Sequence, residues 1–341
     1  MPETPGLVYA VRDRSILLPH FKRFVVEPSL RLLPARLHPN VITHVGHLAN
    51  LAGCLVVLLF AGRGAAPFVV AAALLNFYNW CDNADGGHAR RTGQCSAGGE
   101  LLDHGLDMLN TTYIALVSAI AVGASPEWTA LVAISVPAAC AVTYWEQAET
   151  GLFSLGLLTQ IEAVALLTTI LAVDAIFGVE IWTRLHVGPV TLRLAMTTFA
   201  CATALIGMAG NVRRVWKKRG AVRWVYPLLA FDAAVIAAMF LGALGPLSAV
   251  IVGSAGNVFF GLRSLALRTM GRKPRPEAGL VVAAMMLIAL SVVSIAGLAF
   301  GRTSDIVASA YAVLFFGAYA AINTRESTRA VARLDRRISS G

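Results

Sequence analysis

Charged residues are scarce in this sequence. Only 14% of the 341 residues are Asp, Glu, Lys or Arg, whereas 57% are hydrophobic, and the mean hydropathy is +0.69. Soluble globular domains carry about 25% charged residues, so this composition excludes an ordinary soluble domain. Long apolar runs with few charges predict an all-α polytopic membrane protein.

Paired cysteines and lysine-rich stretches are also missing. The cysteines suit neither a zinc site nor a disulfide framework, because they stand alone at positions 54, 81, 95, 140 and 201. The net charge of +9 comes mainly from arginines that fall between apolar runs rather than on one face, so we expect no nucleic-acid partner. The first ten residues lack a basic region followed by an apolar core, so we expect no removable signal peptide.

Ten apolar stretches have about the 20 residues that a helix needs to cross the hydrocarbon. They cover 40–61, 66–91, 99–122, 126–146, 155–177, 189–212, 224–244, 247–269, 278–300 and 304–322. With a cytosolic amino terminus, 24 of the 28 basic residues fall on the cytosolic side, as the positive-inside rule requires. The other four are Arg63, Arg184, Arg193 and Arg302. We therefore expect a cytosolic or interfacial segment (1–37), an integral membrane domain (38–323) and a basic cytosolic tail (324–341).

Residues 13–37 mix apolar and basic side chains and are too charged to span a membrane. This pattern predicts an amphipathic helix in the membrane interface, with its cations toward anionic headgroups. A simple surface helix is an equally good interpretation.

Four aspartates stand among apolar residues between positions 82 and 107. Asp82 and Asp85 share one helix face, and Asp103 and Asp107 share a face of the next helix, because residues three or four apart lie together. The glycine-rich stretch 91–99 between them predicts a turn that brings the pairs face to face. Such an all-oxygen set suits Mg²⁺, Mn²⁺ or Ca²⁺ rather than Zn²⁺. The alternative is two Asp pairs that cap helix ends.

Small residues and a cation complete the pattern. Gly86, Ala89 and Gly99 would let a phosphate approach closely, and Arg90 lies one turn beyond Gly86, where it could clamp a diphosphate. The stretch 82–107 therefore predicts a metal site that handles phosphates.

These residues resemble the signature of the CDP-alcohol phosphotransferase family, DxxDGxxAR, eight residues, then GxxxDxxxD, and every fixed position is matched. The chain is most similar to the choline and ethanolamine phosphotransferase branch of this family. The similarity consists of the ten expected spans and the sequences GELLDHGLD (99–107), ARRT (89–92) and FGVEIW (177–182). The chain departs from that branch at Gly87 and His88, which replace a Lys-Gln pair, and at Leu102 and Leu106. These departures leave the headgroup and the acceptor open.

The resemblance implies transfer of phosphoethanolamine or phosphocholine from a CDP-alcohol to a lipid hydroxyl such as that of diacylglycerol, with release of CMP. It implies two divalent ions, Mg²⁺ or Mn²⁺, on the four aspartates, a homodimer, and a site on the cytosolic face of a bacterial inner membrane or of the endoplasmic reticulum or Golgi. The base that takes the hydroxyl proton is Asp107 or His104. Asn40 is expected near the nucleotide, although a helix cap is an equal reading.

Two other functions remain open at this point. A transferase that uses CDP-diacylglycerol and a small alcohol shares the signature, and a secondary transporter would also combine ten spans with embedded acids. Further polar residues have weaker claims. Glu146, Glu149 and Glu162 are candidates for shaping a headgroup pocket, whereas we expect helix-to-helix hydrogen bonds from Asn211, Asp232 and Asn257 and tight packing at Gly253 and Gly256.

Overall fold

The structure is a computed structural model that describes residues 10–155, 159–220, 222–272 and 277–295, with isolated positions between 309 and 332. The last expected span (304–322) and the basic tail (324–341) lie largely outside the described residues, as do residues 1–9.

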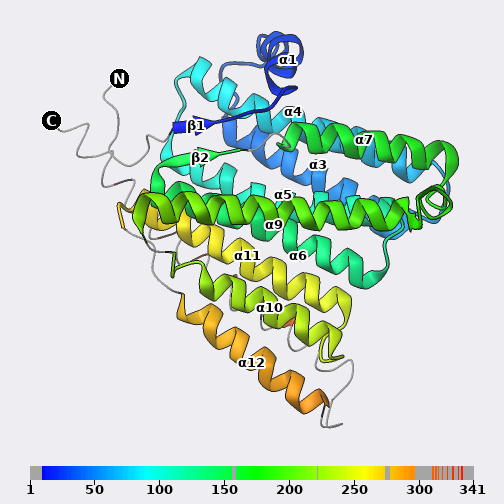
Figure 1. Ribbon diagram of the computed structural model, residues 1–341. Helices are drawn as coiled ribbons and strands as arrows, with labels where there is room; N and C mark the ends of the chain where they lie inside the picture. The colour runs from blue at the N-terminus through cyan, green and yellow to red at the C-terminus, as the bar shows by residue number, and fades with distance from the viewer. Residues whose placement is uncertain are drawn as a thin grey trace. The chain divides into compact units, whose positions relative to one another are not determined.

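Long helices follow one another along the described chain (Figure 1). They are α3 (Pro39–Phe60), α4 (Ala66–Thr92), α5 (Ala97–Ala121), α6 (Pro126–Thr150), α7 (Gln160–Phe177), α9 (Leu192–Arg219), α10 (Tyr226–Phe240), α11 (Pro246–Thr269) and α12 (Ala278–Ile295). Short elements connect them: α1 (Leu18–Phe21), the π-helix η1 (Lys22–Val26), α2 (Glu27–Leu30) and α8 (Ile181–Arg184). Strand β1 (Ala10–Arg12) pairs with β2 (Leu152–Ser154), and β3 (His186–Val187) pairs antiparallel with β4 (Val190–Thr191).

Five of the described helices are long and apolar enough to cross a membrane, judged by length and composition: α3, α6, α7, α9 and α11. Helices α4 and α5 are as long, at 27 and 25 residues, but they contain the charged motif. The chain is thus an all-α membrane protein. Ten crossings, the division into three segments and the interfacial position of the amino-terminal helix stay predictions.

The chain forms two compact units. We call Arg12–Ala124 with Leu155–Phe199 the motif unit, because it contains the four aspartates, and the remainder the second unit. Helix α9 begins in the motif unit and ends in the second.

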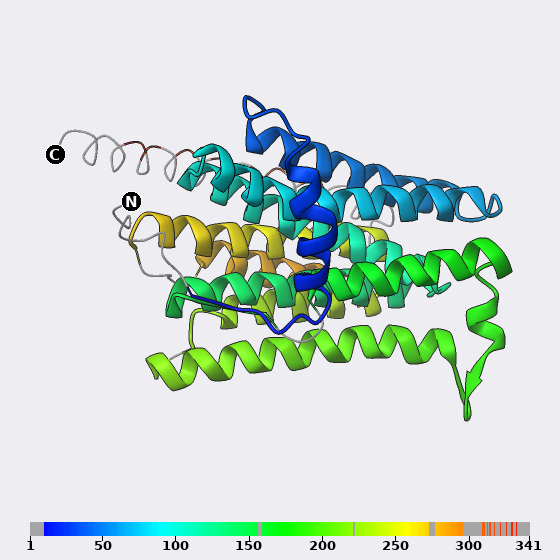
Figure 2. The same ribbon diagram turned by 90° about the horizontal axis from the view of Figure 1, so that it is seen from above.

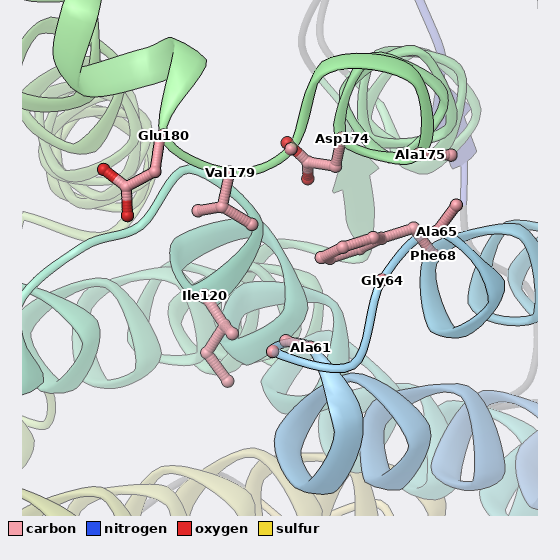
Figure 3. Close-up of a pocket in the computed structure, with 11 residues that line it drawn as sticks. Ala61, Gly64, Ala65, Phe68, Ile120, Asp174, Ala175, Val179 and Glu180 are labelled. Atoms are coloured by element: carbon pink, nitrogen blue, oxygen red, sulfur yellow. The ribbon is translucent and has the colours of Figure 1, made fainter.

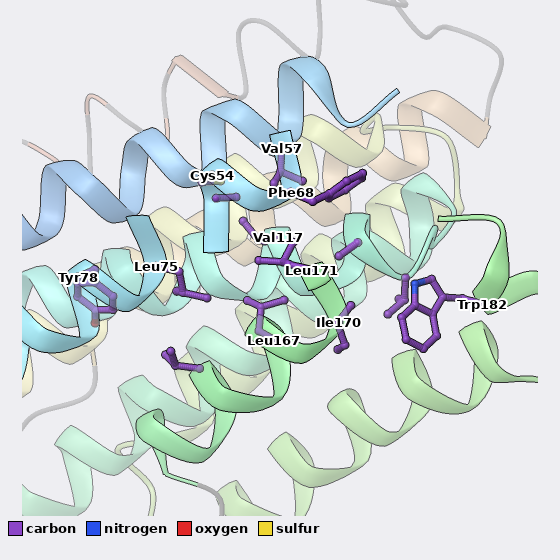
Figure 4. Close-up of a cluster of buried hydrophobic side chains, with 14 residues drawn as sticks. Cys54, Val57, Phe68, Leu75, Tyr78, Val117, Leu167, Ile170, Leu171 and Trp182 are labelled. Carbon is purple, nitrogen blue, oxygen red and sulfur yellow. The ribbon is translucent and has the colours of Figure 1, made fainter. Parts of the chain in front are cut away.

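Apolar side chains from α3, α4, α5 and α7 fill the middle of the motif unit (Figure 4). Val57 and Leu171 are completely buried, and Leu75 and Val117 pack with them. Trp182 of α8 closes one end of this cluster. Burying a large apolar side chain stabilises a water-soluble protein by about 1.5–3 kcal/mol. Between membrane helices the hydrophobic effect is largely absent, and van der Waals packing stabilises the contact instead.

Local signals set the helix ends near the motif. Pro39 occupies the first turn of α3, where its missing N–H costs nothing, and the His38 ring accepts a hydrogen bond from the Asn40 amide at 3.2 Å. Ser96 caps α5 by accepting from the Gly99 amide at 3.0 Å. Helix α4 ends at Gly93, whose φ of 71° is left-handed and therefore favours glycine.

The amino-terminal helical segment, α1 to α2, crosses the direction of α3 and α4 (Figure 2). Its Val26 is buried against Ile42, Cys81 and Ala84. The Trp80 indole donates to the Ser29 hydroxyl at 2.7 Å. The opposite side exposes apolar groups, with Phe24 66% accessible. A helix with one face on protein and apolar side chains on the other is compatible with the predicted interface.

Close backbone contacts hold the second unit together. A Cβ on Gly253 would lie 2.8 Å from an Ile134 carbon, and one on Gly256 would lie 2.1 Å from the Phe231 ring. Asn257 donates to a carboxylate oxygen of Asp232 at 3.2 Å. Tight packing at both glycines and a helix-to-helix hydrogen bond are therefore confirmed.

We predict that Gly256→Ala destabilises the second unit by about 1–3 kcal/mol, because the new methyl group collides with a fully buried ring. The thermal unfolding midpoint of the purified protein in detergent should fall. Gly207→Ala on α9 is the matched control, since a Cβ there meets nothing within 4 Å. Equal midpoints for the two variants would contradict the packing argument.

Candidate metal and phosphate site

The four aspartates lie at the ends of α4 and α5 that the loop 93–96 joins. Helices α4 and α5 each pack on both α3 and α7. The acids therefore lie where four helices meet. Asp85 is 4% exposed, and Asp82, Asp103 and Asp107 are partly buried.

The structure brings all four carboxyl groups together in cross-helix pairs. Asp82 lies within hydrogen-bonding distance of Asp107, and Asp85 lies within hydrogen-bonding distance of Asp103. Two carboxylates approach this closely only with a proton or a cation between them. The cluster thus has the electrostatic character of a cation site. Two separate Asp pairs that cap helix ends, the alternative interpretation, would not need to approach each other.

His104 belongs to the same cluster. One ligand atom each from Asp103, His104 and Asp107 can be chosen so that all lie within 4.8 Å of one another. The sequence left open whether His104 faces the cleft, because consecutive helical residues diverge by about 100°. The side chain reaches the cluster in spite of that offset, so a nitrogen donor stands beside the predicted oxygen set.

Two neutral side chains that the sequence did not single out hold the aspartates in place. The Thr43 hydroxyl of α3 donates to Asp85 Oδ2 at 2.6 Å, and the Gln160 amide of α7 donates to Asp82 Oδ2 at 3.0 Å. Thr43 lies 42 residues from Asp85 in the chain. Gln160 is 78 residues from Asp82, and no local pattern reveals that contact.

The glycines and Arg90 form a cradle beside the acids. An added Cβ on Gly86 would lie 3.3 Å from Arg90 Nη1, so the guanidinium folds back over this glycine. An added Cβ on Gly99 would lie 3.3 Å from Asn40 Oδ1. Asn40 of α3 and Gly99 of α5 are therefore neighbours, and Arg90 covers Gly86 on α4. Ala89 immediately precedes Arg90.

Their neighbours Gly87, His88 and Arg91 serve the amino-terminal segment. Leu30 packs on Gly87: a Cβ added to Gly87 would lie 2.8 Å from Leu30 Cδ1. The buried His88 ring contacts the Leu37 carbonyl at 2.8 Å, and Arg91 donates to the Leu33 carbonyl at 2.7 Å. Gly87 and His88, which depart from the branch pattern, and Arg91, which matches it, thus fasten residues 30–37 to α4.

The three glutamates proposed for a headgroup pocket have other contacts. Glu162 belongs to the capping box of α7 and also accepts from the Ser15 hydroxyl at 2.6 Å. Glu146 lies in the second unit, fully buried, and pairs with Arg214 through two hydrogen bonds of 2.5 and 2.8 Å. Glu149, also in the second unit, lies 4.0 Å from Arg219.

The donor set fits a hard divalent cation. Asp103 Oδ1 is buried without a hydrogen-bond partner among the described residues, so it is available as a ligand. Carboxylate oxygens suit Mg²⁺ and Mn²⁺.

Comparison with known proteins agrees with this geometry. A family model described as CDP-alcohol phosphatidyltransferase matches residues 36–231. Cholinephosphotransferase 1 of Gallus gallus is 30% identical over 209 residues, 58% of this chain and 61% of that protein. The human cholinephosphotransferase 1 is 28% identical over 201 residues, 52% of this chain and 50% of that protein. An uncharacterized CDP-alcohol phosphatidyltransferase class-I family protein of Dictyostelium discoideum is 30% identical over 190 residues, 54% of this chain and 46% of that protein. The chain spans about half the length of the curated relatives it matches.

We predict that Thr43→Val weakens Mn²⁺ binding by about 10–100-fold. Without the hydrogen bond from Thr43, the Asp85 carboxylate is no longer held in the orientation that binds the metal. Mn²⁺ binding to the purified protein can be followed by electron paramagnetic resonance. Thr169→Val is the control, since the Thr169 hydroxyl donates within its own helix, to the Ala165 carbonyl. Unchanged Mn²⁺ affinity in Thr43→Val would remove Thr43 as a positioning residue.

Proposed function

This chain belongs to the CDP-alcohol phosphatidyltransferase family, and we propose that it transfers a phosphoalcohol from a CDP-alcohol to a lipid hydroxyl and releases CMP. The observation that supports this most is the convergence of the four signature aspartates, with Arg90 folded over Gly86 beside them. A diphosphate needs this combination of cation-binding acids and a guanidinium.

The proposed reaction is a single displacement at phosphorus. The lipid hydroxyl oxygen forms a bond to the β-phosphorus, the bond from that phosphorus to the bridging oxygen breaks, and CMP departs with the bridging oxygen and its electron pair. The hydroxyl proton passes to a base of the protein. Phosphoryl transfer of this kind depends mainly on positioning and electrostatic stabilisation.

Asp82, Asp85, Asp103 and Asp107 are the proposed metal ligands. Two divalent ions, Mg²⁺ or Mn²⁺, would supply positive charge to the diphosphate and to the leaving oxygen. Arg90 binds the diphosphate through its guanidinium. The small residues Gly86, Ala89 and Gly99 leave room for the phosphates, and Asn40 lies beside Gly99, where it can contact the cytidine nucleotide.

Two side chains remain candidates for the base. Asp107 adjoins Asp82, and His104 lies in the same cluster as Asp103 and Asp107. An imidazole titrates nearer to neutral pH than an unperturbed carboxyl group does. The proximity of His104 to the cluster supports it more than the sequence alone did.

The proposed donor is CDP-choline or CDP-ethanolamine, and the proposed acceptor is diacylglycerol. The support is the similarity to proteins named cholinephosphotransferase 1. The alternative within the family is transfer of a phosphatidyl group from CDP-diacylglycerol to a small alcohol. A cytosolic position for the site and assembly into a homodimer complete the proposal.

We predict that removal of the base lowers turnover by about 10²–10⁴-fold. Asp107→Asn should also weaken Mn²⁺ binding, because Asp107 is a proposed metal ligand, whereas His104→Ala should retain it. Asp107→Asn and His104→Ala should be assayed separately for CMP release, with Mn²⁺ affinity measured on each. If His104 is the base, His104→Ala loses turnover and still binds Mn²⁺. A variant that keeps turnover excludes its residue.

The substrate assignment can be tested with labelled CDP-choline, CDP-ethanolamine and CDP-diacylglycerol, each with its candidate acceptor. We expect metal-dependent CMP release with one of the first two donors and diacylglycerol. Asp85→Asn is the inactive control. Consumption of CDP-diacylglycerol alone would contradict the branch assignment, and the absence of CMP release with every donor would contradict the enzymatic function and favour a transporter.

A further inference from the structure

The aspartates lie at one end of the motif-unit helices. A second polar feature lies at the other end of the same helices. Residues 61–65 between α3 and α4, together with parts of α5 and α7, enclose a pocket of about 510 Å³ (Figure 3). Along α4, Phe68 in this pocket precedes Asp85 by 17 residues, which is about 25 Å at 1.5 Å per residue. The pocket is therefore separate from the proposed phosphate site.

The inner wall of this pocket includes a buried carboxylate with one satisfied oxygen. Asp174 of α7 is 2% exposed. Its Oδ1 accepts a hydrogen bond from the Trp182 indole at 2.6 Å, whereas Oδ2 is buried and has no hydrogen-bond partner among the described residues. A carboxylate oxygen left in this state is costly unless a ligand with a proton or a positive charge reaches it.

The surroundings of Asp174 are electronegative. Helices α3, α5 and α7 all end at this pocket, at Phe60, Ala121 and Phe177, so three carboxyl-terminal helix ends face the same region. Such ends carry partial negative charge and favour cations. They outnumber the single amino-terminal end of a long helix in the lining, that of α4, which carries partial positive charge. Glu180 adds a second carboxylate, and neither Asp174 nor Glu180 is ion-paired within the part of the chain that the structure describes.

The rest of the lining decides between a bare metal ion and an organic cation. Only Asp174 and Glu180 among the lining residues carry side-chain oxygens; the others are glycines or apolar, namely Ala61, Gly62, Gly64, Ala65, Phe68, Ile120, Ala175, Gly178 and Val179. Mg²⁺ and Ca²⁺ take six or more oxygen ligands. A pocket of this volume with apolar walls and few polar groups suits a small organic molecule.

We propose that this pocket binds an organic ammonium group, with the positive nitrogen at Asp174 Oδ2 and its carbon substituents against the apolar wall. The ammonium can belong to a soluble amine or to the headgroup of an aminolipid, since both offer the same chemistry. This proposal does not depend on the reaction proposed above, because binding alone is measured.

The test uses the purified full-length protein in detergent with n-butylammonium chloride as the probe and n-butanol as its neutral counterpart. We expect butylammonium to bind in calorimetry and raise the unfolding midpoint, and butanol to do neither at the same concentration. Asp174→Asn should weaken butylammonium binding at least tenfold, since asparagine retains an acceptor for Trp182 but loses the charge. Glu127→Gln, an exposed acid at the start of α6, should bind as the parent does.

A second variant tests the proposal if Asp174→Asn does not fold. Ala65 is exposed and lines the pocket, so Ala65→Trp should occlude it and abolish butylammonium binding without disturbing the contact between Asp174 and Trp182. Undiminished binding in folded Asp174→Asn or in Ala65→Trp, or equal stabilisation by butanol, would overturn the proposal.

Bilayer discs distinguish the two sources of the ammonium. A higher unfolding midpoint in phosphatidylethanolamine than in phosphatidylglycerol for the parent, reduced in the Asp174 or Ala65 variant, would identify a lipid headgroup. Stabilisation by butylammonium without that lipid effect would identify a soluble amine. The absence of both effects would overturn the proposal.

Discussion

The mutual repulsion of four carboxylates is the constraint on which the motif unit depends. Asp82 approaches Asp107 and Asp85 approaches Asp103 across two helices. Charges of one sign in a partly buried site are unfavourable without compensating cations or protons. The surrounding helices must therefore hold the acids in place as well as bring them together. Thr43 of α3 and Gln160 of α7 do so through hydrogen bonds. Four helices, α3, α4, α5 and α7, therefore contribute side chains to this point.

The same four helices explain the rest of the unit. Their middle sections supply the apolar cluster around Val57, Leu75 and Leu171, which contains no charged side chain. Neutral polar contacts, such as those of Asn50 with Asn110, lie between the helices midway along them, whereas the carboxylates lie toward the two ends. At one end the acids converge, with Arg90 beside them. At the other, three carboxyl-terminal helix ends and Asp174 surround a pocket. One bundle geometry produces two electronegative sites about 25 Å apart along α4.

The second unit meets the cost of buried polarity differently. Its Glu146 carboxylate is fully buried and is paired with Arg214, and Asn257 reaches Asp232. Satisfied pairs of this kind fix how neighbouring helices align, and removing one partner would leave an uncompensated buried charge. The close approach at Gly253 and Gly256 adds packing. The clustered aspartates accept hydrogen bonds from the neutral side chains of Thr43 and Gln160, whereas Glu146 is paired with a cation of the protein.

By itself, the sequence determined the helical class, the approximate ends of α4 and α5, and the four aspartates with their phosphate-handling neighbours. Each of these follows from local information: apolar runs long enough to span, caps and glycines at helix ends, and acids three or four residues apart. Only the tertiary structure decided that α4 and α5 both pack on α3 and α7, that His104 joins the cluster, and that Thr43 and Gln160 support it. It also decided that Glu146 pairs with Arg214 and that Asp174 faces a pocket. These contacts join residues far apart in the chain, and helical periodicity fixes which residues share a face but not which helix that face meets.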